Sequence, residues 1–115
     1  WNRDGRIDLI TSPIHSPAQL LSNESKGNNN WITLKLIGTA TNTIRQPIGC
    51  LVELKTNRRT YHRQVIGGGS YASTNREALT FGIPSDETVQ SLTIRWPGNS
   101  PQEKFVIDKL INSYF

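Results

Sequence analysis

Apolar residues recur at every second position through most of the chain after residue 30. In the segment 31–37, Ile32, Leu34 and Leu36 fall on one side and polar side chains fall on the other. This period of two is typical of a strand with one buried face. No window of the length that a globular helix needs keeps an apolar period of about 3.6 residues, and β-branched residues are frequent. The pattern predicts an all-β domain, either a small antiparallel sandwich or a partly open barrel.

Five further segments show the same alternation. They are Ile48–Lys55, Arg58–Ile66, Glu77–Ile83, Thr88–Trp96 and Gln102–Ile107. The dipeptide Thr56-Asn57 separates two of them and predicts a hairpin turn. Cys50, the only cysteine of the sequence, is in phase with the apolar side of its segment. We therefore expect it to be a small buried core residue and not a nucleophile.

The character of the sequence changes near residue 26. Before that point it holds an Asp-Gly loop and two short apolar pieces, Ile7–Ile10 and Ala18–Leu21, whereas Lys26–Asn30 has no apolar residue to bury. We expect a β-hairpin region at residues 1–25, a linker at 26–30 and a β domain at 31–115. Because the chain begins at Trp1, inside a motif, and contains no Met, we expect it to be part of a longer protein.

Charge and hydropathy limit the class of partner. Thirteen Lys and Arg residues against nine Asp and Glu residues give a net charge of +4. A basic balance suits a polyanion, but the basic residues are scattered apart from a group between residues 55 and 63, so we do not expect nucleic acid as the partner. No apolar run approaches the roughly 20 residues of a membrane-spanning helix, and we expect no such span.

The first residues, Asn2-Arg-Asp4-Gly5-Arg6-Ile-Asp8, form the most specific short motif. Oxygen donors at alternating positions, a glycine for a sharp turn and a final carboxylate are what a calcium loop requires. The alternative is an ordinary Asp-Gly turn before a strand. The motif resembles the calcium loops of FG-GAP/VCBS propeller repeats. That resemblance implies that Asn2 and Asp4 are side-chain ligands, that Arg6 offers its backbone carbonyl and that Asp8 closes the site around Ca²⁺ in the intact propeller. The first acidic ligand would precede Trp1, so we expect no calcium in this chain alone. It also implies that residues 1–25 are the end of a propeller blade.

A glycine-rich segment, Gly67–Gly69, follows one of the predicted strands. A phosphate-binding loop would need a helix after the glycines and usually a lysine, and the sequence offers neither. Consecutive glycines more simply allow positive φ angles or a bulge between strands. Loops on a rigid β scaffold also carry binding residues. Four polar residues of this loop are therefore candidate ligand-binding residues: Ser70, Tyr71, Ser73 and Asn75.

Basic residues and one aromatic residue alternate along the segment 58–66. Arg59, Tyr61 and Arg63 fall on one side of that predicted strand, with Lys55 and Arg58 nearby. Such a combination can bind single-stranded nucleic acid or a sulfated glycan. The simpler interpretation, which we favour, is a solvated strand face whose charges prevent edge-to-edge pairing.

No residue pattern supports catalysis. His15 and His62 fall in different regions without the spacing of metal ligands, and no local nucleophile motif is present. We expect no catalytic residue and no enzyme activity.

The longest resemblance runs from Trp31 to Pro97 and is to the ASPIC/UnbV domain of cartilage-acidic-protein-like and bacterial extracellular proteins. It is carried, in order, by Trp31-Ile-Thr-Leu-Lys-Leu-Ile-Gly38, Ile48-Gly49, Arg63-x-Val65-x-Gly67-Gly-Gly-Ser-Tyr71-x-Ser73, Phe81-Gly82 and Val89-x-Ser-Leu-x-Ile-Arg-Trp-Pro97. Cys50 stands where the family tends to have alanine.

The resemblance implies a non-catalytic module, extracellular, periplasmic or at the cell surface, that follows a calcium-binding propeller. Its function would be adhesion or contact with a protein or an extracellular glycan. Two alternatives stay open: a glycan- or polyanion-binding domain that uses the basic residues named above, and an accessory domain of a larger enzyme.

Overall fold

The computed structural model describes residues 1–38, 45–75, 78–98, 102–107 and 111–114. Every regular element in these ranges is a β-strand, which confirms the predicted fold class. Because the described residues contain no helix, they contain none that could span a membrane.

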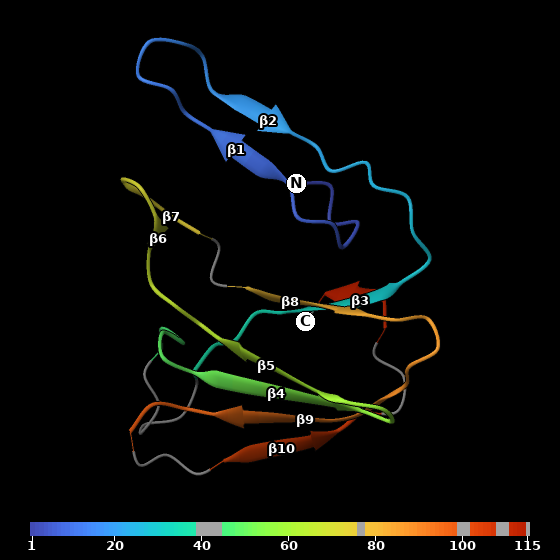
Figure 1. The fold of residues 1–115 in the computed structure, drawn as a ribbon. Helices are drawn as coiled ribbons and strands as arrows, with labels where there is room; N and C mark the ends of the chain where they lie inside the picture. Colours follow the sequence, from blue (N-terminus) through green and yellow to red (C-terminus); the bar gives the residue numbers. More distant parts are fainter. Residues whose placement is uncertain (39–44, 76–77, 99–101, 108–110, 115) are drawn as a thin grey trace.

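Two sheets form the body of the molecule (Figure 1). The larger sheet contains, in spatial order, β10 (Glu103–Val106), β9 (Val89–Arg95), β4 (Leu51–Thr56) and β5 (Thr60–Gln64). The smaller sheet contains β11 (Ser113–Tyr114), β3 (Asn30–Leu34) and β8 (Leu79–Ile83). All pairings are antiparallel except that of β11 with β3, which is parallel. Neither sheet closes on itself, so the arrangement is a sandwich and not a barrel.

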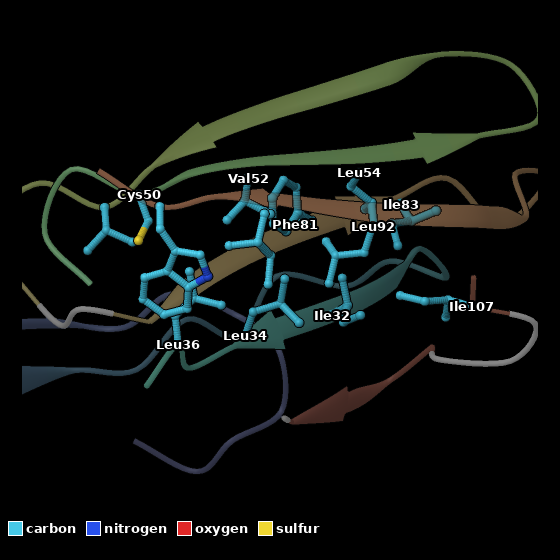
Figure 2. Packing of buried hydrophobic residues seen from close by; sticks show 13 residues of the cluster. Ile32, Leu34, Leu36, Cys50, Val52, Leu54, Phe81, Ile83, Leu92 and Ile107 are labelled. Atoms are coloured by element: carbon cyan, nitrogen blue, oxygen red, sulfur yellow. The ribbon is translucent and has the colours of Figure 1, made fainter. Parts of the chain in front are cut away.

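The core lies between the inner faces of these two sheets, as Figure 2 shows. Its largest fully buried side chains are Phe81, Ile32, Leu54 and Ile83, with Val52, Val65 and Cys50 around them. These residues are buried because side chains alternate between the two faces of a strand. In β3, for example, Ile32 and Leu34 point inward while Trp31 points to the other side. Cys50 is completely buried, as expected, and burial raises the pKa of its thiol.

Most predicted strands occur, and their ends differ by a few residues. The hairpin turn between β4 and β5 lies one residue later than the sequence indicates, because Thr56 remains in its strand. Its backbone N–H donates to the carbonyl of Arg59 at 2.8 Å, and its Oγ1 accepts from the N–H groups of Arg58 and Arg59. Ile48 precedes β4 and is 42% exposed, so it does not share the buried position of Cys50.

Two further pairings were not expected from the alternation. A short hairpin joins β6 (Gly69–Ser70) to β7 (Ser73–Thr74) in the glycine-rich segment. The second is the strand β11 near the C-terminus. It is held beside β3 by Asn112. The backbone N–H of Asn112 donates to the carbonyl of Trp31 at 2.6 Å, and its side-chain Oδ1 accepts from the backbone N–H of Trp31 at 3.1 Å.

A separate two-stranded ribbon near the N-terminus consists of β1 (Leu9–Thr11) and β2 (Gln19–Leu21). Figure 1 shows it apart from the sandwich, and it pairs with no other strand of the described residues. Its cross-strand pairs are apolar on both faces, Leu9 with Leu21 and Ile10 with Leu20. These four side chains are between 40% and 70% exposed. A two-stranded ribbon of this kind is at best marginally stable without further packing.

Candidate functional site

The Asp-Gly loop at residues 2–8 brings together three of the four predicted calcium ligands. Asp4 Oδ1 accepts the backbone N–H of Arg6 at 2.9 Å, and Oδ2 accepts from Asn2 Nδ2 at 2.8 Å and from Arg6 Nη1 at 2.9 Å. Asn2 Oδ1 in turn accepts the backbone N–H of Asp4 at 3.2 Å. These donors lower the pKa of Asp4, the backbone hydrogen bond from Arg6 most of all.

Asp8 makes none of these contacts and instead bonds to Trp1 and to the segment after β2. Its Oδ1 accepts the backbone N–H of Asn23 at 2.9 Å, and its Oδ2 accepts from the α-ammonium of Trp1 at 2.9 Å. The pKa of Asp8 is lowered, chiefly by the hydrogen bond from Asn23. The side chain is only 6% exposed, so Asp8 anchors the loop to the ribbon.

The donor chemistry of this loop matches calcium, since carboxylate, amide and carbonyl oxygens are its preferred ligands. The geometry in this chain does not assemble them into a cage. Arg6 and the ammonium of Trp1 occupy the carboxylate oxygens, and no three acidic, histidine or cysteine side chains of the described ranges converge. The calcium site therefore stays a prediction, with Asn2, Asp4, Arg6 and Asp8 as its residues.

The same loop docks on the sandwich through Gly5 and Trp31. A Cβ atom placed on Gly5 would lie 2.2 Å from Cγ of the Trp31 indole, and Gly5 has a φ of +83°. Both the contact and the backbone conformation require glycine at this position. Trp31 pairs with Gly82 and points away from the core, so the loop rests on the outer face of the smaller sheet (Figure 1).

A buried polar cluster joins the β4–β5 turn to the loop before β9. Glu87 has a fully buried side chain whose Oε2 accepts from Thr56 Oγ1 at 2.7 Å and from the Tyr61 hydroxyl at 3.0 Å. Nε of Arg59 lies 2.7 Å from Oε1. The geometry of that contact is not that of a hydrogen bond, so Oε1 interacts with Arg59 through charge only. Arg58 forms an ion pair with Asp86 beside it.

Because of this cluster, the basic residues between positions 55 and 63 are not all available to bind a polyanion. Arg58 and Arg59 are already paired with carboxylates, and Arg59 lies 6.0 Å from the ring centre of Tyr61. Tyr61 and Arg63 do share a face, as predicted, but it is the face of the buried Leu54 and Val52. Lys55 lies opposite Thr60, on the other face of the sheet. The five basic and aromatic residues therefore do not form one surface.

The four polar candidates of the glycine-rich loop lie together on the β6–β7 hairpin. Ser70, Tyr71, Ser73 and Asn75 are all exposed, and Tyr71 at the tip is 96% exposed. Ser73 Oγ donates to the carbonyl of Tyr71 at 3.2 Å, which shapes the tip. Ala72 completes the turn with a φ of +48°. The hairpin presents these groups to solvent and does not enclose a ligand.

Sequence reasoning did not find Glu87 or the contact of Trp31 with Gly5. The neighbouring pairs Arg58-Arg59 and Asp86-Glu87 carry opposite charges, and that complementarity is the only sequence signal for the cluster. No comparable signal exists for Gly5, because an Asp-Gly turn alone explains the glycine.

Comparison with known families shows which family the chain belongs to. The model of the family described as "ASPIC and UnbV" matches residues 38–108, which is 71 of the 115 residues. The chain belongs to the ASPIC/UnbV family. The match begins after β3, so the Asp-Gly loop, the ribbon and Trp31 lie outside it. No curated protein and no solved structure matches the chain significantly.

The docking contact predicts the effect of Gly5→Ala. The added Cβ would overlap the indole of Trp31, and the positive φ costs roughly 1–2 kcal/mol for any other residue. We expect the loop to leave the sheet while the sandwich stays folded, which would move the indole N–H resonance of Trp31 in an NMR spectrum. Gly82→Ala is the matched control, because a Cβ there meets no atom within 4 Å and the φ is ordinary. An unchanged Trp31 resonance in Gly5→Ala would contradict the docking.

The Glu87 cluster predicts a loss of stability at alkaline pH. Burial, and then the hydrogen bond to Glu87, raises the pKa of Tyr61 above its ordinary 10.0. The folded state thus holds this proton more tightly than the unfolded chain does. The resulting stabilisation is complete below pH 10.0 and disappears as the pH rises through the raised pKa.

Urea unfolding at neutral pH and above pH 10.0 tests this behaviour. Tyr61→Phe should cost about 1–2 kcal/mol at neutral pH through the lost hydrogen bond, and should lose less stability at alkaline pH than the natural chain. Tyr71→Phe, at the exposed hairpin tip, should change neither value. An identical alkaline loss in Tyr61→Phe and the natural chain would exclude Tyr61 as its source.

Proposed function

We propose that this ASPIC/UnbV chain is a non-catalytic extracellular interaction module attached to a calcium-binding propeller. The sandwich provides the contact surface for a protein or glycan partner. The N-terminal ribbon is the edge of the propeller's last blade. The location follows the family resemblance and is extracellular, periplasmic or at the cell surface.

The ribbon is the observation that carries this proposal. Leu9, Ile10, Leu20 and Leu21 place apolar side chains on both faces of two short strands. A ribbon that is apolar on both faces is stable only when further strands or sheets cover it. The sandwich does not cover it, since β1 and β2 contact no other described strand. Neighbouring strands of a propeller blade and the adjacent blade would supply both covers.

The Asp-Gly loop adds independent support. It precedes β1 directly, as a calcium loop precedes its strand in an FG-GAP/VCBS repeat. Asp4 already has a lowered pKa, so its carboxylate stays ionised across the physiological range. A calcium ion would take over the oxygens that Arg6 now satisfies. The Gly5–Trp31 contact would then connect the metal loop rigidly to the β domain.

The polyanion-binding alternative has less support. Of its cationic residues, Arg58 and Arg59 are engaged with Asp86 and Glu87, and Lys55 points to a different face from Arg63. The absence of catalysis by this domain is part of the same proposal.

The melting temperature in calcium and in chelator tests the propeller assignment. It should be measured on a protein that joins this chain to upstream propeller blades, beside the chain alone. We expect calcium to raise the melting temperature of the joined protein by several degrees, and Asp4→Asn to remove most of that rise. Asp86→Asn is the matched control, because Asp86 is an exposed carboxylate paired with Arg58 on the sandwich.

Two results would contradict the proposal. If calcium does not change the melting temperature of the joined protein, the proposed calcium binding is wrong. A calcium effect that Asp86→Asn reduces as much as Asp4→Asn would place the metal outside the Asp-Gly loop.

A further inference from the structure

A groove of about 510 Å³ lies between the Asp-Gly loop, the linker and the outer face of the smaller sheet. Its volume falls in the usual range of ligand sites, and it lies at a junction between two parts of the chain, where such sites are frequent. One aromatic side chain, Trp31, lines it, and no aliphatic side chain does. The groove therefore lacks the apolar pockets that anchor a peptide.

Amide side chains provide half of the polar side chains that line the groove. Asn28, Asn29, Asn30 and Asn112 all border the groove. Asn112 is held in place, since its Nδ2 donates to Asn30 Oδ1 at 3.2 Å while its Oδ1 accepts from the N–H of Trp31. Asn28 and Asn29 are exposed and make no hydrogen bond within the described residues. Each free amide offers two donors and an acceptor, which suits a ligand that carries many hydroxyl groups.

The charges of the groove favour an anion. Its lining contains a single carboxylate, Asp4, and Arg6 already neutralises that group at 2.9 Å. Lys26 also lines the groove, and it has no ion-pair partner in the described parts of the chain. An ammonium on a flexible stem at the edge of an open groove can reach a carboxylate or sulfate of a bound molecule.

Gly82 leaves open space in the lining of the groove. It pairs with Trp31 across the strands, yet a Cβ placed on it would meet no atom within 4 Å. Its φ lies outside the left-handed region, so the backbone there does not require glycine. Gly5 lies against the indole, but Trp31 remains partly exposed. The space over Gly82 leaves room for a flat apolar face to contact the exposed part of the ring.

We infer that this groove binds an acidic oligosaccharide. The C–H face of one sugar ring stacks on Trp31, hydroxyl groups bond to the amides of Asn28 and Asn29, and a carboxylate or sulfate pairs with Lys26. The groove borders the predicted calcium loop and shares Asp4 and Arg6 with it, but the proposed sugar contacts use other side chains. It lies apart from the basic residues of β5, and the inference does not depend on the proposed propeller.

An NMR titration of the chain with trigalacturonate tests the inference. We expect shifts of the Trp31 indole N–H and of the side-chain amides of Asn28 and Asn29. Lys26→Gln should weaken binding about tenfold, as expected for a lost hydrogen bond to a charged group. Lys104→Gln, which removes an exposed lysine from β10 on the other sheet, should leave binding unchanged.

Gly82→Val tests the groove itself. Valine adds volume to the lining of the groove without a clash at its Cβ and suits a strand better than glycine does, so the melting temperature of the variant should not fall. Binding of trigalacturonate should nevertheless be lost. Unchanged binding in a folded Gly82→Val variant would overturn the inference.

Two comparison ligands define the chemical class. Maltotriose, which is neutral, should bind more weakly than trigalacturonate, and triglutamate, an acidic peptide, should not shift the Trp31 indole. Equal binding of maltotriose would overturn the acidic assignment, and equal binding of triglutamate would overturn the sugar assignment. The absence of shifts with trigalacturonate at millimolar concentration would overturn both.

Discussion

Phe81, Ile32 and Leu54 fill the space between the two sheets, and the arrangement of the sandwich depends on that contact. Each sheet alone would expose one apolar face, and their packing removes both faces from water at once. Strand order follows from it, because β3 and β8 supply one inner face and β4 and β9 the other. The other face of the smaller sheet therefore points away from the core, and Trp31 on that face contacts the N-terminal loop.

The polar contacts then secure positions that apolar packing leaves free. Glu87 joins the β4–β5 turn to the loop before β9, and a buried carboxylate is tolerated there because Thr56 and Tyr61 donate to it and Arg59 balances its charge. Asn112 fixes the C-terminal strand beside β3 in the same way, through two hydrogen bonds to the backbone of Trp31. Both links join segments that are distant in sequence.

The sequence was sufficient for features that depend on local periodicity. The strands of both sheets other than β11, the burial of Cys50 and the family itself could be predicted, since alternation and the order of motifs can be read from the sequence. The β6–β7 hairpin could not, because strands of two residues have no alternation to detect. The Glu87 cluster and the Gly5–Trp31 contact depend on strand register and on docking, which a single sequence does not reveal. The same limit explains why Lys55 and Arg63 look like neighbours in sequence but occupy opposite faces of the sheet.

The sandwich is a stable unit by itself, whereas the ribbon requires further strands that the described residues do not place around it. Native-state hydrogen exchange of the chain tests this claim most directly, residue by residue. The account predicts that amides of β3, β4, β8 and β9 exchange only through global unfolding, while those of β1 and β2 exchange with little protection. Protection of the ribbon equal to that of the sandwich would contradict the claim, because it would mean that the ribbon is stable without the propeller strands proposed to cover it.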